Sequence, residues 1–142
     1  MSWYQLLDGV KERTDFDFKG SIINIESNDN LTPSGDVAIE IPSDDLTAVI
    51  EAVKGENQEN LLKVDGANFK YQRSLINDSE TVRNSIWTIP EGENTPGAIV
   101  TVILKSKIIL LIRTYGENKD NVETAKAHNL LDRIIRNLID LI

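Results

Sequence analysis

The clearest pattern in the chain is a broad apolar stripe at its carboxyl end. Apolar residues recur there at the three- and four-residue spacing of one helix face, namely Leu130, Leu131, Ile134, Ile135, Leu138 and Ile139. This spacing predicts a long helix from about Asn121 to the end of the sequence.

A second stripe lies at the amino end. Ser2 and Gln5 have the spacing of a capping box, in which each side chain satisfies a backbone amide of the first turn. The apolar positions that follow share one face: Trp3, Leu6, Leu7 and Val10. We therefore expect a first helix over residues 2–12.

Between these helices the pattern changes to that of strands and turns. A β-branched run at 21–25 and an alternating run at 37–41 predict two strands, separated by a long loop of turn-forming residues. Ser43 is expected to cap a short helix that carries Asp44 and Asp45 in its first turn and stops at Gly55.

The second half of the chain predicts a series of strands. Residues 62–64 lead into the hairpin signal Asp65-Gly66, after which Phe69, Tyr71 and Arg73 are expected on one side of a strand. Further strands are predicted at 86–89, 99–104 and 108–114. Strands joined by short turns pair antiparallel, so the fold class is α+β in a single domain over 1–142, with a sheet face for each terminal helix to cover.

Composition removes most kinds of chemistry. The 142 residues are 40% hydrophobic and 27% charged, as in an ordinary globular domain, and they include no cysteine and one histidine. Thiol chemistry is therefore excluded, and no cofactor or metal is expected. The formal charge of −8 disfavours nucleic acid as a partner.

Catalytic motifs are also missing. The glycines stand singly in turns, so no phosphate-binding loop is formed. Asp15 and Asp17 fit the solvated side of an alternating segment better than a catalytic pair, and residues 28–39 lack the glycine and the terminal glutamate of a calcium loop. His128 has no nucleophile in a recognisable motif. We predict that the protein is not an enzyme.

The sequence predicts a cytoplasmic protein. Its first residues lack the basic start and apolar run of a secretory signal. The most apolar stretch, 98–112, is interrupted by Lys105 and Lys107 and is shorter than the ~20 residues of a membrane-spanning helix.

Binding is the remaining class of function. Trp3 and Tyr4 fit either core anchors or an aromatic shelf for an extended ligand such as polyproline. Lys126, Arg133 and Arg136 on the last predicted helix fit a solvated face better than a phosphate site.

Three stretches resemble one protein family. The chain opens Met-Ser-Trp ahead of a capped helix. Residues 61–73, Leu-Leu-Lys-Val-Asp-Gly-Ala-Asn-Phe-Lys-Tyr-Gln-Arg, are similar to a Gly-Leu-x-Leu-Gly-Gly-x-Lys-Tyr/Cys hairpin, and 101–112 are similar to a penultimate and last strand followed by the terminal helix. In order and spacing these motifs resemble the profilins, in particular divergent members such as those of Asgard archaea.

The resemblance implies a central antiparallel sheet with the amino- and carboxyl-terminal helices packed on one face. It also implies an actin-monomer-binding protein of the cytoskeleton that regulates actin polymerisation. Arg73 is the best-matched actin contact, a charge-assisted donor. The other positions carried over are Gln58, Glu59, Asn68, Thr88, Gly97, Ile99, Asn121, Thr124, Ala125, His128 and Asn129.

Other family ligands are expected to bind weakly. Of the polyproline groove, only Trp3 and Tyr4 offer aromatic rings, and Ile139 stands where a further contact is expected. Flat rings provide most of the contact with proline, so polyproline binding should be weak or absent. Phosphoinositide binding would depend on Lys126, Arg133 and Arg136, working against the negative charge of the chain.

Two other classes of protein fit the same outline. A roadblock or longin-like regulatory scaffold also has a sheet flanked by helices, and it dimerises or binds a small GTPase. A small-molecule sensor of PAS type would need a ligand-sized cavity. Gel filtration separates the first of these from a profilin, which is expected to be a monomer.

Overall fold

The structure, a computed structural model, describes residue 9 and residues 17–32, 35–55, 61–76, 82–88, 97–116 and 122–138. Apart from Gly9, the predicted first helix lies outside these residues. The described strands are β1 (Phe18–Asn24), β2 (Asp29–Asn30), β3 (Leu62–Val64), β4 (Ala67–Ile76), β5 (Val82–Thr88), β6 (Ala98–Leu104) and β7 (Ile108–Thr114), and the helices are α2 (Ser43–Val53) and α3 (Val122–Leu138).

All seven strands join in one sheet, in the order β2-β1-β7-β6-β5-β4-β3. Every pair of neighbouring strands is antiparallel. The predicted turn between β3 and β4 is present, with Asp65 and Gly66 at φ of 56° and 75°, the left-handed values that favour such a two-residue hairpin. The α+β class with an antiparallel sheet is therefore confirmed.

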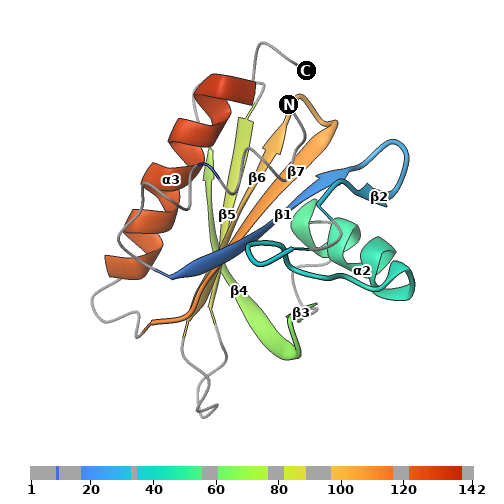
Figure 1. The fold of residues 1–142 in the computed structure, drawn as a ribbon, viewed down its shortest axis with the longest axis horizontal. Coiled ribbons are helices and arrows are strands. Elements are labelled where there is room, and N and C mark those ends of the chain that lie inside the picture. Colours follow the sequence, from blue (N-terminus) through green and yellow to red (C-terminus); the bar gives the residue numbers. More distant parts are fainter. Residues whose placement is uncertain are drawn as a thin grey trace.

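The two helices cover opposite faces of the sheet (Figure 1). Alternate residues of β7 belong to different cores. Leu110 and Ile112 pack in the cluster that contains α3, whereas Ile109 and Leu111 pack in the cluster that contains α2. All seven residues of β7 are buried, because both faces of this central strand are covered. The terminal helix α3 thus takes one face, as expected, over β6 and β7.

The predicted strand at 37–41 is wrong. Only Ala38 forms a bridge there, a parallel one to Gly20 of β1. Val37, Ala38 and Ile39 are all buried in succession, because this segment lies between the two cores, with Val37 in the α3 cluster and Ile39 in the α2 cluster. The apolar residues at 37 and 39 thus pack into two different cores, and they do not mark one face of a strand.

The loop before this segment is held by the side chain of Asn30. Its Oδ1 accepts hydrogen bonds from the hydroxyl of Ser21 at 2.8 Å and from the amide of Thr32 at 3.0 Å, and its Nδ2 donates to the carbonyl of Ile39 at 3.3 Å. Thr32 in turn accepts from the amide of Ile22 at 3.0 Å. These bonds replace the strand ladder that the sequence pattern suggested.

The short helix α2 differs from the prediction at its start. It begins at Ser43, and the residue in the cap position is Pro42, with no side-chain cap. Asp44 and Asp45 lie in the first turn as expected, where their charge favours the helix dipole. Gly55 follows the helix at φ 77°, which confirms the predicted stop.

Strand β4 is longer than predicted and contains a β-bulge. Its pairing with β5 shifts between Tyr71 and Arg73, because Tyr71 pairs with Trp87 and Arg73 with Ile86. An extra residue on one strand breaks the alternation of faces. We expected Phe69, Tyr71 and Arg73 on one side of the strand. This expectation is wrong after Tyr71, where the bulge interrupts the alternation.

Candidate functional site

The register of the sheet brings several of the predicted contact positions to one end of the molecule. Thr88, the last residue of β5, pairs with Lys70 of β4 and with Ala98 of β6. Gly97 directly precedes Ala98. Asn68 lies two residues before Lys70 on β4. Positions far apart in the sequence thus lie at the same end of three neighbouring strands (Figure 1).

The start of α3 lies at this same end. A Cβ atom placed on Gly116, just after β7, would lie 2.9 Å from a carboxylate oxygen of Glu123. Glu123 belongs to the first turn of α3. The helix therefore begins beside the sheet end formed by β4, β5 and β6, and we call these elements together the β4–β6/α3 end.

The predicted contact residues differ in their exposure. Ala125 and Asn129 are exposed on α3, and His128 and Asn68 are half-buried. Ile99 is 0% exposed and Thr124 is buried, so their side chains face the interior and are not available to a partner. For Arg73 and Thr88 the structure gives the backbone position on β4 and β5. Gln58, Glu59 and Asn121 lie outside the described residues.

Gly97 has a structural role at this end of the sheet. Its φ is 118°, a value that residues with a side chain rarely adopt, and a Cβ atom would overlap the carbonyl oxygen of Thr114 on β7. The hydroxyl of Thr114 accepts a hydrogen bond from the amide of Ala98 at 2.9 Å. Gly97 thus allows the chain to enter β6 in close contact with β7.

The residues considered for phosphoinositides lie on α3, and those considered for polyproline lie outside the described residues. Lys126 is half-buried, and Arg133 and Arg136 are exposed along one side of α3, where the exposed Asp132 also lies. Trp3, Tyr4 and Ile139, the positions considered for polyproline, lie outside the described residues.

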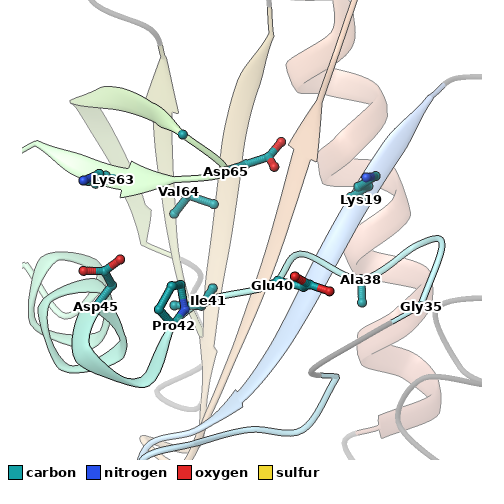
Figure 2. Close-up of a pocket in the computed structure, with 11 residues that line it drawn as sticks. Lys19, Gly35, Ala38, Glu40, Ile41, Pro42, Asp45, Lys63, Val64 and Asp65 are labelled. Atoms are coloured by element: carbon teal, nitrogen blue, oxygen red, sulfur yellow. The ribbon is translucent and has the colours of Figure 1, made fainter.

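A cavity on the α2 side of the sheet was not predicted from the sequence (Figure 2). It has a volume of about 420 Å³ and lies between β3 with its following turn and the segment 38–42. Charged side chains of both signs line it, including Lys19, Glu40, Asp45 and Asp65.

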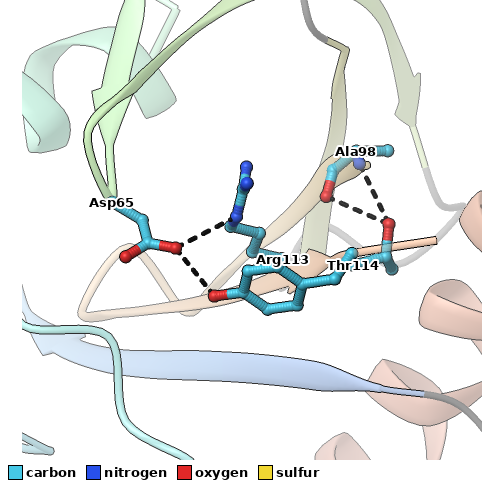
Figure 3. Close-up of polar contacts among 5 residues, drawn as sticks. Asp65, Ala98, Arg113 and Thr114 are labelled. Atoms are coloured by element: carbon cyan, nitrogen blue, oxygen red, sulfur yellow. Dashed lines mark hydrogen bonds and ion pairs between the residues drawn. The ribbon is translucent and has the colours of Figure 1, made fainter. Parts of the chain in front are cut away.

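Next to this cavity lies a buried arginine, which the sequence analysis also missed (Figure 3). Arg113 of β7 is 3% exposed, and its Nε lies 3.2 Å from Oδ2 of Asp65. The hydroxyl of Tyr115 donates to the same oxygen at 2.8 Å. The guanidinium carbon lies 4.9 Å from the centre of the Phe69 ring and 4.6 Å from that of Tyr115, within the range of cation–π contacts.

The contact between Arg113 and Asp65 is an ion pair without an aligned hydrogen bond. The Nε and Nη1 atoms of Arg113 have no hydrogen-bond partner among the described residues, although Nε is close to the carboxylate. The attraction is therefore mainly electrostatic, and the two aromatic rings supply much of the remaining packing. A charged residue within an otherwise apolar strand was the one sequence signal for this cluster.

Tyr115 should make the stability of the fold sensitive to alkaline pH. Burial, together with the hydrogen bond and the negative charge of Asp65, raises the pKa of Tyr115 well above its usual range. A group whose pKa is raised on folding contributes stability that is complete below its unfolded pKa of about 10 and is lost as the pH rises towards its folded pKa. Tyr115→Phe should therefore show a shallower loss of stability above about pH 10.

Urea unfolding midpoints measured from pH 8 to 12 would test this prediction, with the phenolate absorbance followed in parallel. Asp65→Asn serves as a second variant, because Asn tolerates the left-handed backbone of position 65 and removes the charge that opposes ionisation. Its Tyr115 phenolate should form at a lower pH. Equal alkaline slopes for the wild type and Tyr115→Phe would contradict the assignment.

Two further observations concern the described part of the chain. Neither described helix is long and apolar enough to cross a membrane. Among the described residues, no three histidine, aspartate or glutamate side chains gather in a way that could hold a metal ion.

Comparison with known proteins adds no assignment. No protein-family model matches the chain, and no curated protein matches it by sequence. A function for this protein therefore has to be argued from its own residues and their arrangement.

Proposed function

We propose that this protein binds monomeric actin and regulates its polymerisation in the manner of a profilin, with a profilin-like fold. The observation that carries the proposal is the β4–β6/α3 end. Asn68 and the exposed residues of α3 come from segments in which the sequence resembles profilins. Thr88 and Gly97 are further positions carried over from that family, and they lie at the same end of the sheet. The antiparallel sheet and the covering helix α3 agree with this proposal.

Two large apolar residues are exposed near this end. Leu61, which directly precedes β3, is 49% exposed, and Val122, the first residue of α3, is 50% exposed. They are the large hydrophobic residues that are exposed within the described part of the chain. Single exposed apolar residues are common on protein surfaces, so these two residues alone do not indicate an interface.

The proposed mechanism requires no catalysis. The protein binds one end of the actin monomer in a one-to-one complex, which lowers spontaneous nucleation while monomers are still delivered to growing filaments. In this proposal the protein acts in the cytoplasm as a monomer, and its affinity for polyproline and for phosphoinositides is weak.

An actin polymerisation assay with the cognate actin tests the proposal. The wild-type protein should lengthen the lag phase of assembly and form a one-to-one complex detectable by calorimetry. Two substitutions at the proposed surface should each weaken the complex at least about tenfold, the effect of losing one strong interface contact. They are Arg73→Glu, which reverses the proposed donor, and Ala125→Arg, which places a long side chain on the exposed side of α3.

The control is Arg136→Glu, which makes the same charge reversal in the last turn of α3, away from the β4–β6/α3 end. It should bind actin with the affinity of the wild type. Absence of any actin complex with the folded wild type would exclude the proposal. A dimer in gel filtration together with no actin binding would favour the roadblock or longin-like alternative.

A further inference from the structure

The cavity on the α2 side has the form of a slot between two stretches of backbone (Figure 2). One wall is β3 and the turn that follows it, residues 63–66. The other wall is the segment 38–42, which leads into α2. Lys19 of β1 lies at one end of the slot and Asp45 of α2 at the other.

Both walls have main-chain groups available for pairing. Among the described residues, β3 is the last strand of the sheet and pairs with β4 alone, so one of its edges is unpaired there. On the opposite wall, the amide of Ile39 is bonded to Gly20, and the carbonyl of Pro42 accepts from the start of α2. Between them, no hydrogen bond within the described residues uses the amide or carbonyl groups of Glu40 and Ile41.

The charges of the slot favour a basic ligand. Glu40, Asp45 and Asp65 line it, against Lys19 in the lining and Arg113, which is paired with Asp65 from behind. Lys63 of β3 also lines the slot. The lining itself thus holds three carboxylates against two ammonium groups, and the chain as a whole carries −8. The field of the protein therefore attracts cations to this opening.

We propose that this slot binds an extended peptide segment of a partner protein that carries a basic side chain. The peptide pairs with the open edge of β3 and with the free groups of Glu40 and Ile41, which is recognition by strand addition. Its basic side chain lies between the carboxylates of Glu40 and Asp65. The volume of about 420 Å³ is within the range of pockets that bind small ligands, and it suits a segment of a few residues. The slot adjoins the proposed actin surface, because Lys63 in its wall pairs with Asn68 of β4.

The wall opposite β3 is held in place before any ligand binds. The side chain of Asn30 donates to the carbonyl of Ile39, and Gly20 bonds to both Val37 and Ile39 through its backbone. A preformed site loses less conformational entropy when it binds a peptide than a flexible loop does. Because this wall is already held in place, we expect even a short peptide to bind.

Nuclear magnetic resonance titration of the full-length, ¹⁵N-labelled protein tests the proposal. The probes are two blocked pentapeptides, acetyl-Thr-Val-Lys-Val-Thr-amide and the same peptide with Glu in place of Lys. The Lys peptide should shift the amide signals of residues 39–41 and 62–66 and slow the hydrogen exchange of the amides of Glu40 and Ile41. It should bind at least about tenfold more tightly than the Glu peptide.

Glu40→Lys should reverse this preference, and the control Glu26→Lys, which makes the same charge change at an exposed turn outside the slot, should leave it unchanged. Equal binding of the two peptides, or the absence of shifts at both walls, would overturn the proposal. Signals of the slot that shift with protein concentration alone would show that a second copy occupies it, which would also overturn the proposal.

Discussion

Gly97→Ala should destabilise the fold by about 2–5 kcal/mol, the sum of a left-handed backbone cost of about 1–2 kcal/mol and an overpacking cost of about 1–3 kcal/mol. The new Cβ would overlap the carbonyl oxygen of Thr114, and its carbonyl carbon would be 3.1 Å away. Thr114 belongs to the buried strand β7, which cannot move without disturbing both cores. Urea unfolding measures the effect.

Gly66→Ala is the matched control for this prediction. Gly66 also has a positive φ, 75°, but a Cβ at this position has no atom within 4 Å. It should therefore cost only the backbone term of about 1–2 kcal/mol. If Gly97→Ala were no more destabilising than Gly66→Ala, the close contact between Gly97 and β7 would be excluded.

The expected destabilisation makes Gly97→Ala a poor test of actin binding. Gly97 was carried over as a contact position, but its substitution is expected to disturb the entry into β6 itself. A loss of actin binding in Gly97→Ala would thus reflect the altered fold. Ala125→Arg, on an exposed helix position, is the cleaner test of the surface.

Asn30→Ala is the second substitution with a large expected effect. It should lower the free energy of unfolding by about 2–4 kcal/mol, because several hydrogen bonds of about 0.5–1.5 kcal/mol each are lost and buried polar groups are left unpaired. The hydroxyls of Ser21 and Thr32, the amide of Thr32 and the carbonyl of Ile39 all lose a partner. Ser21 and Thr32 are buried, so water cannot readily replace the lost bonds. Chemical denaturation measures the loss, and amide exchange at Thr32 should become faster.

Asn24→Ala provides the comparison. Its side chain accepts two backbone hydrogen bonds in an exposed turn, where water is available as a substitute. It should cost less than about 1 kcal/mol. A similar loss in both variants would mean that the Asn30 network does not hold the loop as the structure indicates.

The elements with strong local patterns were the ones that could be predicted. The apolar stripe at 130–135 predicted helix α3, and the turn pair Asp65-Gly66 predicted the β3–β4 hairpin. These signals depend on residues close together in sequence. They do not need knowledge of the rest of the fold.

The segment 37–41 shows where local patterns fail. Its alternating residues suggested a strand, but they are buried between two cores, and the side chain of Asn30 satisfies the backbone instead. A single asparagine that bonds to residues nine positions away on both sides leaves no periodic signal. The same holds for the bulge after Tyr71, which depends on how β4 pairs with β5.

By itself, the sequence determined the α+β class, the hairpins, the carboxyl-terminal helix and the lack of recognisable catalytic motifs, because each of these follows from residue types and short-range spacing. Only the tertiary structure decided which distant residues share a surface. It placed Thr88 beside Lys70 and Ala98, and it buried Ile99 and Thr124, which had been expected as contacts. It also brought Asp65 to Arg113 and opened the slot beside them, because strand pairing and packing across the sheet set these distances.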